Sequence, residues 1–365
     1  MDAAAREEVP MAADAERFRL RRFVELLDAE GELETIDDPI DAIDLAARLD
    51  GNPRAVRFRS VRGEGTGAGR TGAGGGMELV GNVMGSRRRL ALAFGVPERD
   101  LLAEVVRRAR TPIPPVRVGA APPVQQVVWT GADADLTRLP VHLQHGEDGG
   151  LYVSAGIDVS RSLDGARRNV GYRRLMLRGR REAGVDLVAP SDLRAIYAEH
   201  VARGRPLPIA FVIGSHPADG VAAVGTWPAA DEVALMGALR GAPVPMTPCV
   251  SIDLEVPADA EVVLEGTLDP AGWSELEGPF GELFGYYGHL KRNPVFRLSA
   301  ITCRRDALFQ TLAIGGRHLA LTDTAQLNAL RTEAAAWAAL ATAVREPVAI
   351  HAPPACGGVS HLRIA

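Results

Sequence analysis

Acidic and aromatic side chains are concentrated between Glu275 and Tyr287, in the segment ELEGPFGELFGYY. Pro279 removes a backbone donor and the flanking glycines allow unusual backbone angles, so this segment is predicted to be a kinked loop. Residues five apart on an unbroken strand point to opposite faces. A bend at Pro279 would turn Glu277 and Glu282 into one pocket, where different surroundings separate a charged carboxylate from a proton donor. The alternative, from this segment alone, is an acidic surface turn.

Further polar residues stand where strands and helices are expected to begin. The run Asn169–Arg174, NVGYRR, opens a predicted strand with an amide and two guanidinium groups. Asp192 and Glu232 each fall in the first turn of a predicted helix, where the helix dipole favours negative charge. Capping alone would account for these two acids.

Length and composition indicate a soluble protein of two or three domains. The chain has 365 residues, of which 47% are hydrophobic and 24% charged, with a net charge of -5. The arginines are scattered among acids, which argues against nucleic-acid binding. Neither a membrane span nor a signal pattern is recognisable, so a cytoplasmic location is expected. Cys249, Cys303 and Cys356 lack the spacing of a zinc site or a disulfide framework.

Periodicity divides the chain into a small α/β region followed by a strand-rich region. Helices are expected at 17–30, 41–50 and 86–109, and strands at 55–61 and 77–84, before a proline cluster at 112–115. Strands are then expected at 124–130, 151–159, 172–178, 208–214, 250–256, 261–265 and 295–304, with helices at 191–202 and 231–239. Many strands with few helices favour a barrel or a layered sheet. An alanine-rich helix at 323–343 and a strand at 347–352 follow.

The insert between Gly63 and Gly76 contains the formal pattern G-x-G-x-x-G at Gly67, Gly69 and Gly72. A dinucleotide-binding turn must lead directly into a helix, whereas this tract leads into another predicted strand. We therefore interpret the insert as a flexible loop.

Four ordered segments resemble the UbiD family of prenylated-flavin decarboxylases: 169–174, 232–241, 256–266 (VPADAEVVLEG) and 277–282 (EGPFGE). The segment 80–87, VGNVMGSR, is also similar to the family's N-terminal domain. The resemblance implies a mixed α+β, α/β multidomain fold. Residues 1–115 would form a small α/β domain, and 116–318 a central split β-barrel of the flavin-reductase type that binds the cofactor. Residues 319–365 would begin a C-terminal oligomerisation domain that the chain does not complete.

Carried over by position, the resemblance assigns catalytic roles to Arg174, Glu277 and Glu282. Arg174 would pair with Glu277 and orient the substrate carboxylate, and Glu282 would donate a proton to the carbon that carbon dioxide leaves. Enclosure of Glu282 among Phe280, Phe284, Tyr286 and Tyr287 would favour its protonated form. Phe284, Tyr286 and Tyr287 would either stack on the substrate or only fill the barrel wall.

The resemblance also implies a metal and cofactor contacts. Asn169 and Glu232 match ligands of a divalent metal, usually manganese, and Asp192 stands where the family commonly has a histidine. Potassium is a second candidate ion. The implied contacts to prenylated FMN come from Asn169, Tyr172, Arg173, Arg174, Ser215 and His216.

The expected function is reversible, non-oxidative decarboxylation of an aromatic, heteroaromatic or α,β-unsaturated carboxylic acid. A flavin prenyltransferase would supply the cofactor, and a homo-oligomer, of dimer size or larger, is expected. The alternative is a non-catalytic flavin-binding paralogue or a subunit of a decarboxylase complex. Asp192 and the short C-terminus favour the alternative, whereas the combination of Arg174, Glu277 and Glu282 favours the enzyme.

Overall fold

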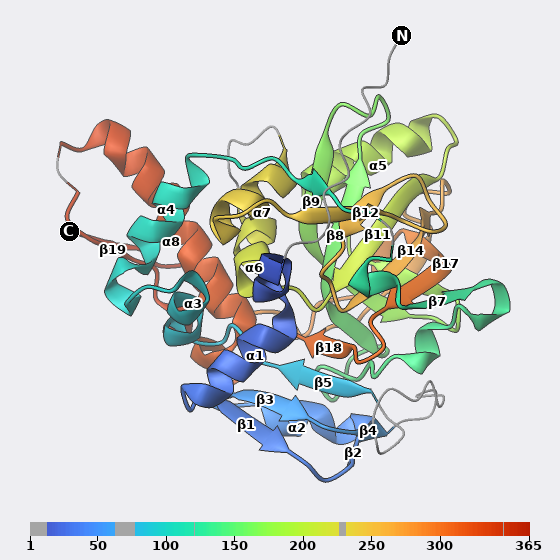
Figure 1. Cartoon of the computed structure of the whole chain (residues 1–365), viewed down its shortest axis with the longest axis horizontal. Helices are drawn as coiled ribbons and strands as arrows, with labels where there is room; N and C mark the ends of the chain where they lie inside the picture. The colour runs from blue at the N-terminus through green and yellow to red at the C-terminus, as the bar shows by residue number, and fades with distance from the viewer. Residues whose placement is uncertain (1–12, 63–76, 120, 226–230, 346) are drawn as a thin grey trace.

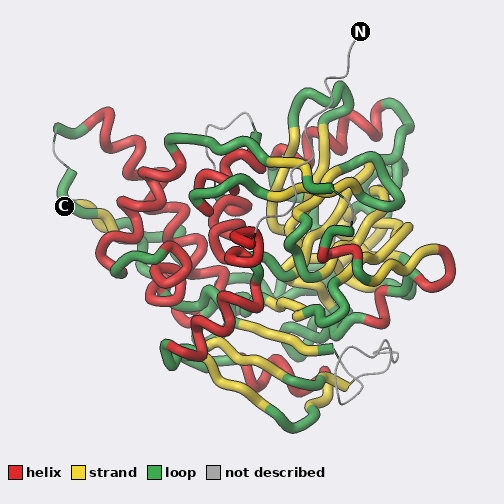
Figure 2. The backbone as a smooth tube through the Cα atoms, viewed as in Figure 1, coloured by secondary structure: helices red, strands yellow, loops and turns green. Residues whose placement is uncertain are grey.

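The computed structural model describes residues 13–62, 77–119, 121–225, 231–345 and 347–365 (Figure 1). The strands of the central part gather on one side of the molecule, and most helices lie on the other (Figure 2). The glycine-rich insert at 63–76 lies outside the described residues. Within the described ranges, no helix has the length and apolar character needed to cross a membrane.

The N-terminal part is a four-stranded mixed sheet in the order β1-β3-β5-β18. β1 (Leu33–Ile36) runs parallel to β3 (Ala55–Phe58), β3 runs antiparallel to β5 (Glu78–Gly81), and β5 runs parallel to β18 (Leu308–Thr311). The last strand therefore comes from a segment far along the chain. The remaining elements are β2 (Ile40–Asp41), β4 (Val61–Arg62), α1 (Leu20–Ala29), α2 (Leu45–Leu49), α3 (Arg87–Phe94) and α4 (Leu101–Ala109).

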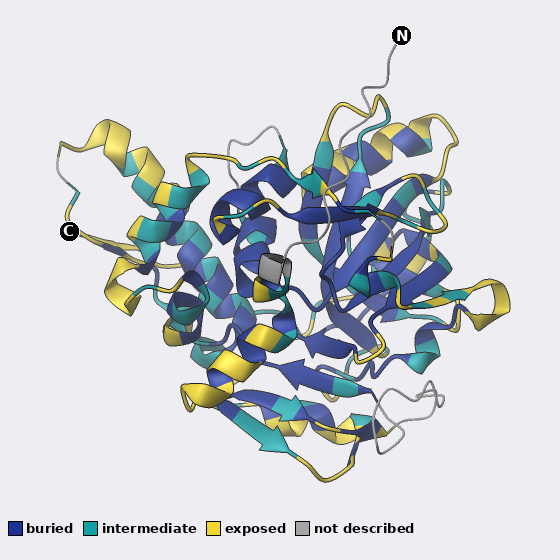
Figure 3. Cartoon of the chain, in the orientation of Figure 1, coloured by how far each residue is buried: buried dark blue, intermediate teal, exposed yellow. Residues whose placement is uncertain are grey.

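Local sequence explains where these helices begin and end. α1 buries Leu20, Phe23 and Leu27 on one face, as the amphipathic spacing predicts, and leaves its outer face exposed (Figure 3). The hydroxyl of Ser86 accepts from the N–H of Arg89 and caps α3. Gly95 ends α3 in the left-handed conformation that glycine adopts without strain.

The central part is a closed barrel of antiparallel strands in the order β10-β9-β8-β11-β14-β17, with β17 pairing back onto β10. Its strands are β8 (Tyr152–Arg161), β9 (Arg168–Leu177), β10 (Glu182–Val185), β11 (Leu207–Ile213), β14 (Val262–Leu268) and β17 (Val295–Cys303), and β7 (Val127–Thr130) extends β17. Along β11, Phe211 packs in one core cluster and Val212 in the other. Both faces of this strand are thus buried, which explains its continuous apolar run.

Helices cover one side of the barrel. α6 (Pro217–Val224) lies between β9 and α8 (Asp323–Ala343), α7 (Glu232–Arg240) packs on β9, α6 and α4, and α5 (Asp192–Ala202) packs elsewhere on β9 (Figure 1). The other strands are β6 (Val116–Arg117), β12 (Pro245–Pro248), β13 (Glu255–Pro257), β15 (Glu275–Glu277), β16 (Lys291–Asn293), β19 (Ile350–His351) and β20 (Arg363–Ile364). Short 3₁₀ helices occupy Ala13–Phe18, Ala42–Asp44, Glu98–Asp100, Pro123–Gln125, Gly131–Asp133, Leu136–Arg138, Leu319–Leu321 and Pro354–Cys356.

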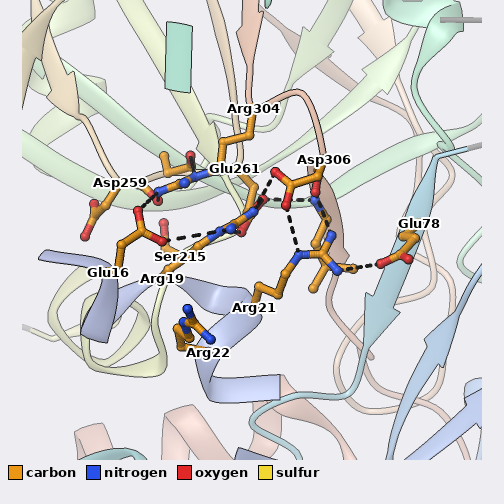
Figure 4. Close-up of polar contacts among 12 residues, drawn as sticks. Glu16, Arg19, Arg21, Arg22, Glu78, Ser215, Asp259, Glu261, Arg304 and Asp306 are labelled. Carbon is orange, nitrogen blue, oxygen red and sulfur yellow. Dashed lines mark hydrogen bonds and ion pairs between the residues drawn. The ribbon is translucent and has the colours of Figure 1, made fainter. Parts of the chain in front are cut away.

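Ion pairs fasten the N-terminal segment to the barrel (Figure 4). Arg19 Nε lies 3.0 Å from Oε1 of Glu261, whose side chain is fully buried. Arg304 pairs with Glu16 at 3.1 Å. Because the carboxylate of Glu261 also accepts from the N–H of Leu308, it links α1 to the start of β18.

The mixed fold with a central barrel and a small N-terminal α/β region confirms the predicted class. The strand predicted at 250–256 is wrong for residues 250–254, because the buried carboxylate of Glu265 accepts the backbone N–H groups of Val250 and Ser251 and holds a turn there; only its last two residues belong to a strand, β13. Sequence reasoning also missed α6, whose first turn begins at Pro217 after His216. The helix predicted at 323–343 is confirmed as α8.

Candidate active site

A cavity of about 510 Å³ lies between β9, the end of α6, α8 and the loop that joins β15 to β16. We call it the central cavity, and the segment 278–290 the hairpin loop. Its volume falls within the range of small-molecule and cofactor sites. The central cavity brings together the residues discussed below: Asn169, Tyr172, Arg173, Arg174, Asp186, Asp192, Glu232, Phe280, Glu282, Leu283, Leu312, Ile314, Thr324, Asn328 and Arg331.

Arg174 is the centre of a cluster of charged side chains. Its guanidinium group contacts Glu277 at 3.1 Å, Asp186 at 3.1 Å and Glu282 at 3.4 Å. Burial acts to lower the pKa of Arg174, but the three carboxylates more than offset it and raise the pKa above its usual value. The structure therefore brings Arg174, Glu277 and Glu282 together across more than a hundred residues of sequence.

Glu277 is buried, whereas Glu282 is partly exposed. The Glu277 side chain is 1% exposed, and its carboxylate accepts from Arg174 and, at 3.1 Å, from the amide of Asn293. Glu282 is 26% exposed, and its other oxygen lies 3.0 Å from Nζ of Lys291. The two carboxylates thus share Arg174 but differ in burial and in their second partner, as two groups with separate roles require.

The hairpin loop is fixed by a second buried carboxylate. Asp148, whose side chain is fully buried, accepts from the backbone N–H groups of Gln144, His145 and Gly281 at 2.8–3.0 Å. Gly149 N–H donates to the carbonyl of Pro279 at 2.7 Å. A Cβ atom at Gly149 would lie 2.0 Å from the carbonyl oxygen of Gly278, so only glycine allows this approach.

Another part of the central cavity is rich in oxygen atoms. The amide nitrogen of Asn169 donates to Oδ2 of the buried Asp158 at 2.6 Å. Within the described residues no hydrogen bond engages the amide oxygen of Asn169. Glu232 accepts from the backbone N–H of Val170. Asp192 lies at the rim, where its Oδ1 is 3.1 Å from Arg167.

Negative charge at this oxygen-rich end is incompletely balanced. Burial raises the pKa of Asp158 to about 6, and its Oδ1 lies 3.5 Å from Nε of Arg173 without a hydrogen bond. Burial, together with Asp158 and Asp192, raises the pKa of Glu232 to about 7. Oxygen donors with unbalanced negative charge suit a hard divalent cation.

The donor set nevertheless departs from a complete protein-only metal site. In the described ranges, no three His, Cys, Asp or Glu side chains lie close enough to hold a metal ion by themselves. A metal bound by Asn169 and Glu232 would therefore need further ligands from outside the protein, such as phosphate oxygens. The amide oxygen of Asn169 and the carboxylate of Glu232 fit such a metal, whereas the carboxylate of Asp192, which also lines the cavity, pairs with Arg167 in this structure.

Two of the sequence-predicted cofactor contacts do not line the central cavity. Ser215 lies beside the Arg19–Glu261 ion pair (Figure 4), and its N–H donates to Gln310. The ring of the buried His216 packs edge-on against Phe18 at 5.3 Å between centroids. The turn into α6 directs both residues toward the N-terminal segment, so we leave them out of the proposed site.

The expected aromatic enclosure of Glu282 does not form. Phe284, Tyr286 and Tyr287 are exposed on the hairpin loop, whereas Phe280 is buried and lies under the guanidinium of Arg174 at 4.3 Å from the ring centroid. Gly281 pairs with Tyr287 in a local bridge, which folds the loop back and directs its aromatic tip outward. Their exposure contradicts the alternative in which these three rings only fill the barrel wall.

Sequence reasoning missed several residues that shape the site. Asp186 pairs with Arg174, Asn293 holds Glu277, and Asp148 fixes the hairpin loop. The run HGEDGG at 145–150 was the available signal for Asp148, because adjacent glycines after an acid indicate close backbone approach. Nothing near Asp186 or Asn293 in the sequence distinguishes them.

Comparisons with known proteins give a consistent family assignment. The model of the 3-octaprenyl-4-hydroxybenzoate carboxy-lyase Rift-related domain, UbiD, matches residues 116–318, and that of the corresponding N-terminal domain matches residues 24–109. An evolved dimeric form of the UbiD-class enzyme HmfF from Pelotomaculum thermopropionicum, solved with prFMN, is similar with a TM-score of 0.85 and 29% identity over 95% of this chain and 78% of that chain.

Two decarboxylases of aromatic acids are also similar. Vanillic acid decarboxylase from Sedimentibacter hydroxybenzoicus, in closed form, gives a TM-score of 0.84 and 29% identity over 95% of this chain and 73% of that one. Apo 3,4-dihydroxybenzoic acid decarboxylase (AroY) from Klebsiella pneumoniae gives a TM-score of 0.82 and 26% identity over 93% of this chain and 73% of that one.

Proposed function

Because this chain belongs to the UbiD family of carboxy-lyases, we propose that it catalyses reversible, non-oxidative decarboxylation of an aromatic, heteroaromatic or α,β-unsaturated carboxylic acid. The observation that carries this proposal is the convergence of Arg174, Glu277 and Glu282 in one cavity. A binding protein has no need of two carboxylates that share one guanidinium group inside a cavity.

The proposed cofactor is prenylated FMN with a manganese ion. HmfF, which is similar over most of this chain, has been solved with prFMN and with FMN. Asn169 and Glu232 would hold the metal and, through it, the cofactor phosphate, and Tyr172, Arg173 and Arg174 line the same cavity. When bound, the prenylated flavin supplies the electron sink that loss of carbon dioxide from an sp² carbon requires, which no side chain offers.

The protein's own residues position the acid and deliver the proton. Arg174 would bind the substrate carboxylate, while Glu277 and Asn293 hold the guanidinium group in one orientation. Phe280, Leu312 and Ile314 provide apolar wall that excludes water near the reacting carbon. Glu282 would then protonate that carbon. Both its oxygens contact cations in this structure, so proton uptake by Glu282 must loosen its pairs with Arg174 and Lys291.

The second candidate is a flavin-binding subunit that does not turn over substrate. The position of Asp192 favours it, because an aspartate paired with Arg167 leaves the metal with fewer protein ligands than the resemblance implies. Both candidates predict flavin binding, so only turnover separates them. The dimeric form of HmfF supports an oligomer as the working state of this protein as well.

The test is production of the chain together with a flavin prenyltransferase, followed by three measurements on the purified protein. The visible spectrum reports flavin, elemental analysis reports manganese, and carbon dioxide release from a panel of aromatic and unsaturated acids reports turnover. We expect bound flavin, manganese and release from at least one acid. Flavin and manganese with neither release nor exchange of labelled carbon dioxide would favour the non-catalytic candidate, and absence of flavin would reject both.

A further inference from the structure

The wall of the central cavity contributed by α8 carries polar residues at helical spacing. Thr324, Asn328 and Arg331 lie at positions i, i+4 and i+7 of this helix, so they share one face, and all three line the cavity. The start of α8 is fixed because Asp323 accepts from the backbone N–H groups of Met84 and Ala313 at 2.6 and 2.7 Å. This face therefore has a defined position relative to the barrel.

Among the described residues that line this cavity, Arg331 is a cation without a partner. It forms no hydrogen bond or ion pair with any residue in the described ranges, whereas Arg173 bonds Ser191 and Arg174 contacts three carboxylates. Burial lowers the pKa of Arg331, and no carboxylate offsets that effect. The side-chain amide of Asn328, one turn earlier, likewise lacks a partner within the described part of the chain.

An unpaired, partly buried guanidinium group destabilises the fold unless it gains something when a ligand binds. The chain contains 46 acidic residues, yet none of those described pairs with the guanidinium group of Arg331. A cation that has no partner in a binding cavity typically recognises an anionic ligand.

Charges at the Arg174 end indicate which anion is expected. Arg174 and Lys291 face the three carboxylates of Asp186, Glu277 and Glu282, so this end carries a net negative charge before any substrate binds. An acid with one carboxylate needs only Arg174. An acid with a second negative group would be repelled from the cavity unless a further cation received that group, and Arg331 is such a cation.

Phosphate is the other source of anionic oxygen atoms in this site. The oxygen-rich end at Asn169 and Glu232 belongs to β9 and α7, whereas Arg331 belongs to α8. The cofactor phosphate already has a proposed partner in the metal held at that end. Substrate is therefore the better match for the guanidinium on α8.

We propose that Asn328 and Arg331 form a subsite for a second anionic group of the substrate, so that the acid converted by this protein carries two carboxylates or a carboxylate and a comparable anionic oxygen group. This inference rests on the proposed function and specifies its substrate class. The guanidinium group would form charge-assisted hydrogen bonds with the second group, and the Asn328 amide would donate a further one.

Binding of unreactive probes to the FMN-loaded full-length protein tests the subsite without requiring turnover. The probes are benzoate, benzene-1,3-dicarboxylate and benzene-1,4-dicarboxylate, with dissociation constants measured by calorimetry. We expect at least one dicarboxylate to bind more tightly than benzoate. Arg331→Met should weaken that dicarboxylate about ten- to a hundredfold and leave benzoate within about twofold, because the lost interaction involves the second carboxylate alone.

Two further variants separate charge recognition from structure. Arg331→Lys keeps the charge and should retain most of the preference for the dicarboxylate. Arg205→Met removes an exposed arginine outside the cavity and should leave all three dissociation constants unchanged. Thermal unfolding of ligand-free Arg331→Met should occur at the same temperature as the wild type or higher, because an unpaired, partly buried cation is removed.

Three results would overturn the inference: equal affinity of the wild type for all probes, equal weakening of benzoate and dicarboxylate by Arg331→Met, or reduced FMN content in that variant. The last would assign the guanidinium to the cofactor phosphate. Failure of the proposed function would give a different result. The protein would still bind the dicarboxylate more tightly than benzoate, but its prenylated-flavin form would release carbon dioxide from none of the acids.

Discussion

Replacement of Glu277 by glutamine tests the central arrangement of the site with the least change in shape. In the wild type, the buried carboxylate accepts from Arg174 Nε at 3.1 Å, from Arg174 Nη2 at 3.4 Å and from the Asn293 amide at 3.1 Å. Glutamine offers one acceptor oxygen, so its NH₂ group must face another donor. The variant thus loses a charge-assisted hydrogen bond and leaves a buried donor unpaired.

The expected size of the effect follows from that exchange. A hydrogen bond to a charged group contributes about 1.5–3 kcal/mol, and an unpaired buried group costs about 1–3 kcal/mol. Because Arg174 is then less well oriented, we expect the variant to lose about 3 kcal/mol of transition-state stabilisation, which corresponds to about a hundredfold decrease in kcat/KM. Asp186 and Glu282 still contact Arg174, so flavin content should not change.

Glu275→Gln is the matched control, because Glu275 lies on the same strand, β15, but its side chain is 56% exposed and pairs with Arg178 at 3.3 Å. An exposed pair of this kind contributes less than about 1 kcal/mol, so kcat/KM should change by less than about twofold. Steady-state kinetics with the best acid of the panel, together with urea unfolding, provide the measurements. A Glu277→Gln enzyme within threefold of the wild type would refute the role given to the Arg174–Glu277 pair.

Three further outcomes are expected. Glu282→Gln should lower kcat about 10²- to 10⁴-fold with flavin content preserved, because it removes the proposed proton donor, and near-normal turnover would reject that role. Arg240→Met should lower the free energy of unfolding in urea by about 3–5 kcal/mol, since it leaves the buried carboxylates of Asp219 and Asp259 unpaired, while Arg205→Met should change it by less than about 0.5 kcal/mol; equal effects would contradict the argument. Burial lowers the pKa of His142 from 6.5 to about 4. Between pH 7 and pH 5 the unfolded chain therefore takes up a proton at this residue that the folded protein does not. The free energy of unfolding of the wild type should fall by about 2 kcal/mol over that range because of this group. His142→Gln should lose correspondingly less over that range, and an unchanged pH dependence of urea unfolding would exclude this contribution.

The parts of the fold that sequence reasoning predicted are those with strong local signals. β11 is a continuous apolar run, α8 has an alanine-rich helical pattern with Thr322 as its cap, and α5 begins after Ser191. Such features depend on residues close in sequence, so periodicity and capping rules suffice to find them. The first part of the strand expected at 250–256 does not form, because Glu265, a residue outside the segment, binds its backbone N–H groups.

The same distinction applies to the site. Motif order identified the segments that carry Arg174, Glu277 and Glu282, and the structure brings those three side chains together. Asp186, Asn293 and Arg331 acquire their importance only through three-dimensional neighbours. Asp186 pairs with a side chain of β9 and Asn293 with one of β15, whereas Arg331 matters because it has no partner among the described residues. Ser215 and His216 show the converse, since a position next to a strand end does not determine which side of the turn faces the cavity.

The pairing of β5 with β18 affects how this protein is made in the cell. During translation Glu78–Gly81 is synthesised about 230 residues before Leu308–Thr311, which at roughly 5–20 residues per second is an interval of about 10 to 50 seconds. Throughout that interval β5 can pair only with β3, and its other edge, which later binds β18, is open to aggregation. Ribosome-bound chaperones should therefore have their greatest effect on the yield of this protein while the barrel is still being synthesised.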